Sequence, residues 1–147
     1  MYKIKEIKVS TVREIAVESK MFDTPQKAFD FWNKAVVESP WYDTEKEHCV
    51  VLCLDRKNNL KSYNLVSIGT VSSSLLMPRE VFRPAIVSAA SAIILMHNHP
   101  SGDPAPSRAD IEITRKIKES AEILGIDFLD HIIVGSSLYS FREAGLI

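Results

Sequence analysis

The pattern of apolar positions along the chain predicts alternating strands and helices. Residues 49–55 form a continuous apolar run of strand length, which is typical of a central strand buried on both faces. The turn cluster Lys57-Asn58-Asn59 follows, so the next strand, at residues 60–70 and ending at Gly69, is expected to pair with it in antiparallel fashion. The remaining predicted strands are apolar runs at residues 92–96, 128–135 and 139–141.

Three segments carry helix signals. Thr24 followed by Pro25 predicts a helix over residues 25–38, which Ser39-Pro40 ends. A second helix is expected from Pro78, with Pro84 tolerated near its first turns. Its apolar positions are Val81, Phe82, Ala85, Ile86, Ala89 and Ala90. The third is expected from Ser107 to the stop at Gly125, with one apolar face formed by Ile113, Ile117, Ala121 and Leu124.

These elements predict an α/β fold in which a mixed central sheet is flanked by helices, with the second helix packed beside the strand at 92–96. The 147 residues suffice for one domain with a hydrophobic core. We expect this domain at residues 22–147. Residues 1–21 alternate only loosely between apolar and charged, which indicates an N-terminal arm or an edge strand.

Composition and charge narrow the function classes. A formal net charge of -1 argues against a protein held to nucleic acid by bulk electrostatics. No window approaches the ~20 apolar residues of a membrane span, and the N-terminus lacks the apolar core of a secretory signal, so a cytoplasmic protein without membrane contact is expected. Cys49 and Cys53 lie four apart in one predicted strand, roughly 13 Å from each other, and are expected to be reduced core residues.

The stretch from His97 to Asp110 carries the clearest chemistry. It follows a predicted buried strand and precedes the third helix, so it is expected to form a loop, which prolines and Gly102 stiffen. His97 and His99 share a face because side chains at i and i+2 point the same way. Asp110, one turn beyond Ser107, can return a carboxylate to them. Two histidines, one aspartate and an open fourth position are a ligand set of catalytic zinc.

Each part of this set has a structural alternative. Ser107-x-x-Asp110 before an apolar helix is also a capping box, and Ser107 can serve as a cap while its hydroxyl faces the site. A single histidine is more often a hydrogen-bonded structural residue. Only the cluster of three favours a metal.

A hydrolytic metal site also needs a base. From composition alone the candidates are Glu45, Glu47, Glu80, Asp103, Asp130 and His131. Glu47 is the preferred candidate for the base, because it lies at the head of a buried strand and strand ends line clefts. The alternative is that Glu47 is simply a solvent-exposed charge.

Four groups of residues resemble a known family. They are Glu47-His48 before Val50-Val51-Leu52, Pro78-Arg79-Glu80-Val81-Phe82, His97-Asn98-His99-Pro100-Ser101-Gly102-Asp103-Pro104 with Ser107 and Asp110, and Leu129-Asp130-His131-Ile132-Ile133-Val134-Gly135. Together they resemble the JAB/MPN domain of the RadC-like proteins, from about residue 22 to the C-terminus. The resemblance implies a JAB/MPN, cytidine-deaminase-like architecture.

The resemblance also implies a JAMM-type metalloprotease site. In it His97, His99 and Asp110 hold Zn²⁺, Glu47 is the general base on a zinc-activated water, and Ser107 stabilises the oxyanion. Apart from the resemblance, Asp130 and His131 are candidates for a supporting shell around the ligands, and the alternative for His131 is a core histidine. The implied substrates are peptide or isopeptide bonds of peptides or proteins.

Two departures from the family bear on the function. Relatives carry an N-terminal helix-hairpin-helix segment associated with DNA, and this sequence is expected to be a stand-alone form without it. Met77 replaces a histidine that usually precedes Pro78, which leaves the implied metal ligands untouched. Without that segment, and with a net charge of -1, we expect no nucleic-acid partner for this chain alone. The alternative function is a non-catalytic accessory module of DNA repair or recombination with a structural zinc.

Overall fold

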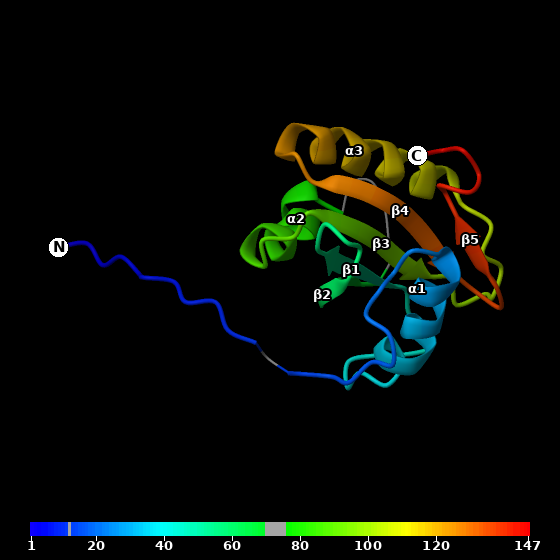
Figure 1. Cartoon of the computed structure of the whole chain (residues 1–147), viewed down its shortest axis with the longest axis horizontal. Helices are drawn as coiled ribbons and strands as arrows, with labels where there is room; N and C mark the ends of the chain where they lie inside the picture. The colour runs from blue at the N-terminus through cyan, green and yellow to red at the C-terminus, as the bar shows by residue number, and fades with distance from the viewer. Residues whose placement is uncertain (12, 70–75) are drawn as a thin grey trace.

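A computed structural model describes residues 1–11, 13–69 and 76–147. Its centre is a five-stranded sheet with the strand order β2-β1-β3-β4-β5 (Figure 1). The strands are β1 (His48–Leu54), β2 (Leu60–Ile68), β3 (Ala92–Asn98), β4 (Asp127–Val134) and β5 (Leu138–Ser140). The helical elements are α1 (Pro25–Phe31), the π-helix η1 (Trp32–Val36), α2 (Pro78–Val87) and α3 (Arg108–Leu124).

The strand directions confirm the predicted mixed sheet. β1 pairs antiparallel with β2 and β3, and β4 pairs antiparallel with β5. β3 and β4 are parallel, and α3 makes the crossover that a parallel pair requires. Every residue of β1 is buried, as the continuous apolar run predicted, because helices cover both faces of the central strands.

Alternation along β1 and β3 separates two cores. One face of the sheet packs against α2 and α3 and includes Cys49, Val51 and Leu95. The opposite face packs against α1 and η1 and includes Val50 and Met96. Both cysteines are buried and free, as expected.

The structure corrects several sequence-based predictions of element ends. The helix predicted over 25–38 continues after Phe31 as a π-helix, with Val37 N–H bonded to the Trp32 carbonyl at 3.1 Å, because apolar spacing does not distinguish the two kinds of turn. The second helix ends at Val87, since Ala89 adopts a left-handed φ of 52°. Ala89 and Ala90 therefore lie outside it.

Two residues placed on apolar helix faces are partly solvated instead. Ile86 of α2 is 59% exposed and Leu124 of α3 is 46% exposed, because each lies at the rim of its helix interface. Ile113, Ile117 and Ala121 are buried as predicted, and Gly125 ends α3 with φ 68°.

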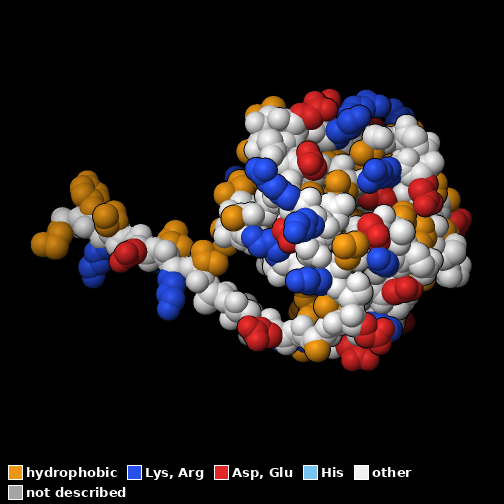
Figure 2. All heavy atoms as spheres, viewed as in Figure 1, with side chains coloured by type: hydrophobic (Ala, Val, Ile, Leu, Met, Phe, Trp, Pro, Cys, Tyr) orange, Lys and Arg blue, Asp and Glu red, His pale blue; other side chains and the backbone are white. Residues whose placement is uncertain are grey.

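The N-terminal segment is largely outside the fold. Residues 1–11 and 13–20 contain no helix or strand, and their side chains are exposed (Figures 1 and 2). The edge-strand alternative is thus limited, within the described residues, to one antiparallel bridge between Met21 and Asn59. Thr70, the last residue of the second predicted strand, lies outside the described residues.

Surface charge and helix hydrophobicity are the features that nucleic-acid and membrane partners would recognise. Acidic and basic side chains lie side by side over the face seen in Figure 2. In the described part of the chain, no helix has both the length and the apolar character needed to cross a membrane.

Candidate metal centre

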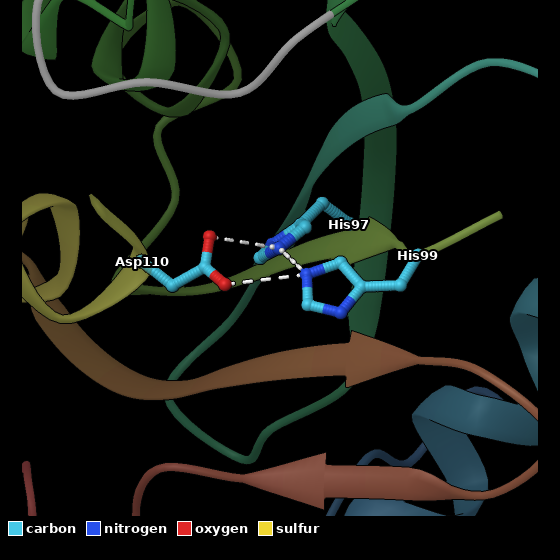
Figure 3. Close-up of side chains that lie close together, drawn as sticks. All are labelled: His97, His99 and Asp110. Atoms are coloured by element: carbon cyan, nitrogen blue, oxygen red, sulfur yellow. Dashed lines mark hydrogen bonds and ion pairs between the residues drawn. The ribbon is translucent and has the colours of Figure 1, made fainter. Parts of the chain in front are cut away.

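Three side chains converge at the end of β3 and the start of α3 (Figure 3). His97 Nε2 lies 3.1 Å from Asp110 Oδ1, and His99 Nε2 lies 3.2 Å from Asp110 Oδ2. The two Nε2 atoms are 3.1 Å apart. All three possible ligand atoms lie within 4.8 Å of one another. Among the described residues, no fourth histidine, cysteine, aspartate or glutamate joins this group.

β3 extends two residues beyond the strand that the sequence predicted at 92–96. His97 and Asn98 belong to the strand and not to the loop, and His97 pairs with Cys49 of β1. The polar residues remain in the sheet because Asn98 has partners on both sides. It pairs with Val134 of β4, and its amide accepts from His48 N–H of β1 at 2.7 Å and donates to the Lys46 carbonyl at 3.0 Å. His97 therefore lies on the α2/α3 face, fully buried.

The loop after β3 fixes His99. Its Nδ1 donates to the Asp103 carbonyl at 2.8 Å, which leaves Nε2 for the cluster. The Gly102 carbonyl accepts from Ser136 N–H at 2.8 Å, anchoring the loop on the end of β4. A Cβ at Gly135 would lie 2.3 Å from that carbonyl oxygen, so only glycine fits where the loop crosses.

Asp110 is both a helix-capping residue and a candidate metal ligand. Its Oδ2 accepts from Ser107 N–H at 2.8 Å while Ser107 Oγ accepts from Asp110 N–H at 3.1 Å, which confirms the capping box. Burial opposes ionisation of this carboxyl, but hydrogen bonding and charge from His97, together with the Ser107 hydrogen bonds, hold its pKa well below the usual range. The site therefore presents an anionic oxygen to two imidazoles.

His131 contacts the cluster from β4. Its Nε2 lies 2.8 Å from His97 Nδ1, and its Nδ1 lies 2.6 Å from Thr114 Oγ1 on α3. Phe141 stacks on the ring with centroids 4.7 Å apart. Burial, reinforced by the neighbouring charge of His97, lowers the pKa of His131 well below its ordinary value, so the ring is neutral.

Asp130 is not brought to the cluster. It faces the opposite side of the sheet, where its carboxylate accepts from Ser140 Oγ and from Arg142 N–H. Burial, only partly offset by these hydrogen bonds, raises its pKa. Its contacts support the end of β4 and β5.

Glu47 directly precedes β1. Alternation along β1 favours the face of Cys49 for it, and the pairing of β1 with β3 ends at Cys49–His97, two residues after Glu47. Its negative charge contributes to the raised pKa of Cys49, after burial and Asp110. The side chain is half-buried, and Gly69 N–H bonds its carbonyl at 2.8 Å.

The other base candidates lie in other settings. Glu80 pairs with Arg79 and Arg83 on α2. The Asp103 carboxylate accepts from Ala105 N–H at 3.0 Å, and Glu45 is exposed. Thr114 was not identified from the sequence, although its position four residues after Asp110 on the buried face of α3 is a signal that could have found it.

The donor set fits a metal ion. Imidazole nitrogens and a carboxylate oxygen suit zinc and related transition metals, and His99 is 14% exposed, which leaves solvent access. The mixed sheet flanked by helices and this cluster match the JAMM-like metallohydrolase architecture that the sequence resemblance implies.

The comparisons with known proteins give the family. The family model described as RadC-like JAB domain matches residues 22–146, and the chain belongs to that family. It is 49% identical over 127 residues to a UPF0758 protein of Trichlorobacter lovleyi, covering 86% of this chain and 53% of that protein. A Geobacter sulfurreducens UPF0758 protein is 45% identical over 130 residues, covering 88% and 55%. The chain thus spans about half the length of these relatives.

Proposed function

We propose that this protein is a zinc-dependent hydrolase of peptide or isopeptide bonds in peptide or protein substrates, acting in the cytoplasm. The observation that carries the proposal is the convergence of His97, His99 and Asp110 within 4.8 Å at the end of a buried strand. A bound zinc ion supplies Lewis acidity, which polarises a carbonyl and brings the pKa of water towards 7.

Glu47 is the general base of the proposal. Its place directly before β1, where alternation from Cys49 favours the face that carries His97, supports a carboxylate that takes a proton from the attacking water. A carboxylate that has accepted this proton can then pass it to the leaving amine.

Ser107 is the oxyanion donor of the proposal. Its hydroxyl oxygen accepts from Asp110 N–H at 3.1 Å, which uses a lone pair and leaves the hydroxyl hydrogen for a developing oxyanion. The side chain is exposed beside a buried ligand. Capping and oxyanion stabilisation are therefore compatible in one residue.

The alternative of a non-catalytic DNA-repair module with a structural zinc is less well supported. Structural zinc is normally closed by four protein ligands, whereas three donors gather in the described chain. A net charge of -1 supplies no general affinity for nucleic acid.

Cleavage assays test the proposal directly. The zinc-loaded chain is incubated with a library of internally quenched peptides and with isopeptide-linked conjugates. We expect cleavage that stops on chelation, returns with zinc and is lost in His97→Ala. Equal cleavage by His97→Ala, or no cleavage of any substrate by fully zinc-loaded protein, would contradict the proposal.

Ser107→Ala separates its two roles. Loss of the N-cap bond is expected to cost about 1 kcal/mol of unfolding free energy, or about 3 °C in Tm. Loss of the oxyanion donor is expected to lower kcat by about 10²-fold with zinc affinity nearly unchanged. Thermal unfolding and steady-state kinetics measure the two effects. A variant with the lower Tm but normal kcat would make Ser107 a cap only.

A further inference from the structure

Two buried polar residues, His131 and Thr114, contact the candidate ligands His97 and Asp110 without being ligands themselves. His131 lies between His97 and Thr114, and neither His131 nor Thr114 is exposed by more than 2%. The Thr114 hydroxyl also bonds the Asp110 carbonyl at 2.8 Å. The contacts thus run from the backbone of one candidate ligand, through α3 and β4, to the ring of another on β3.

The donor and acceptor at each step follow from the first bond. A carbonyl oxygen only accepts, so the single hydroxyl hydrogen of Thr114 points to the Asp110 carbonyl. Thr114 Oγ1 must then accept from His131 Nδ1–H, 2.6 Å away. A neutral imidazole with hydrogen on Nδ1 has a bare Nε2, which accepts from His97 Nδ1–H at 2.8 Å.

A hydrogen on Nδ1 of His97 leaves the other ring nitrogen, Nε2, to bind a metal. With a hydrogen held on Nδ1, His97 keeps Nε2 as the ring atom that faces His99 and Asp110, so a metal that displaces the Nε2 hydrogen would meet a lone pair there. His99 reaches the same state by a different route, because its Nδ1–H is bonded to the Asp103 carbonyl.

We propose that His131 and Thr114 are positioning residues that keep a hydrogen on Nδ1 of His97, so that Nε2 is the ring atom left to hold the metal. This inference rests on the metal binding of the proposed function. Partners of this kind typically change metal affinity by about 10- to 100-fold. A merely space-filling role for Thr114 would give no such dependence on its oxygen.

The first test locates the histidine ring hydrogens in the metal-free 147-residue chain by long-range ¹H–¹⁵N NMR. In the wild type we expect His97 Nδ1 to carry a hydrogen. Thr114→Val removes the acceptor for His131 Nδ1–H, so His131 is expected to move its hydrogen to Nε2 and His97 Nδ1 to lose its hydrogen. Thr114→Ser restores the hydroxyl and should retain the wild-type pattern. A hydrogen retained on His97 Nδ1 in Thr114→Val would overturn the inference.

The second test measures zinc affinity by competition with a chelator. Thr114→Val is expected to weaken binding by about 10- to 100-fold, and Thr114→Ser by less than about threefold. Ser140→Ala is the matched control, because it removes a buried hydroxyl bonded to Asp130 on the other face of the sheet. It should lower stability and leave zinc affinity unchanged.

The outcomes separate the two proposals. If Thr114→Val and Ser140→Ala both bind zinc like the wild type, the relay is refuted while the metal site stands. If the wild type binds no zinc, the proposed function fails, and the tautomer measurement on metal-free protein still decides the relay. Should Thr114→Val not fold, Thr114→Ala removes the same oxygen and carries the same two expectations.

Discussion

Glu47→Gln is expected to lower kcat of the zinc-loaded protein by about 10²- to 10⁴-fold, the contribution of a positioned general base. Glutamine keeps the size of the side chain and its hydrogen-bonding capacity but cannot accept a proton. Because the candidate ligands are His97, His99 and Asp110, zinc content should stay at the wild-type level. Kinetics and metal analysis on the same sample check both statements.

The control for this substitution is Glu45→Gln. Glu45 is an exposed glutamate two residues upstream, and its backbone N–H bonds Asp43. The Glu45→Gln variant loses the same charge near the same strand but keeps Glu47, so its kcat should be close to that of the wild type. If Glu47→Gln loses zinc, Glu47 is a ligand or a structural group and not the base.

Zinc is expected to stabilise the folded chain strongly. At a free concentration about 100 times Kd, a ligand that binds only the native state adds about 2.7 kcal/mol, which corresponds to about 5–10 °C in Tm. Thermal unfolding with zinc and with excess chelator measures the difference. Mg²⁺ at the same concentration should have no effect, because it prefers an oxygen-only octahedral site.

Asp110→Asn is the control for this stabilisation. The asparagine oxygen can still accept from Ser107 N–H, so the helix cap is largely kept while the anionic ligand is lost. The zinc-dependent rise in Tm should therefore disappear. A full rise in Asp110→Asn would mean that zinc stabilises the protein from another place.

The sequence predicted the fold best where local signals and burial agree. The run at 49–55 became the fully buried β1, and Ser107 and Gly125 mark the two ends of α3 through a cap and a left-handed residue. The predictions were wrong where long-range contacts override local signals. The polar residues His97 and Asn98 stay in β3 because β1 supplies partners, and Ala89 ends α2 although alanine favours helices.

The candidate ligand residues could be predicted from the sequence, whereas the hydrogen bonds that link them to residues of other elements could not. The spacing from His97 to Asp110 shows three donor types, and the structure brings them together. The roles of Glu47 and Ser107 stay predictions. The helical spacing of Thr114 from Asp110 could have marked it as a neighbour of the site, but its contact with His131 comes from another strand and could not be predicted. Asp130 adjoins His131 in sequence, yet strand alternation sends it to the other face.

The zinc content of the purified 147-residue chain, measured by mass spectrometry of the metal, tests the central claim most directly. The account predicts about one equivalent of zinc in the wild type and nearly none in His99→Ala, since three protein ligands hold a catalytic ion and two do so poorly. Less than about half an equivalent in the wild type after mild purification and zinc loading, or an unchanged content in His99→Ala, would contradict it.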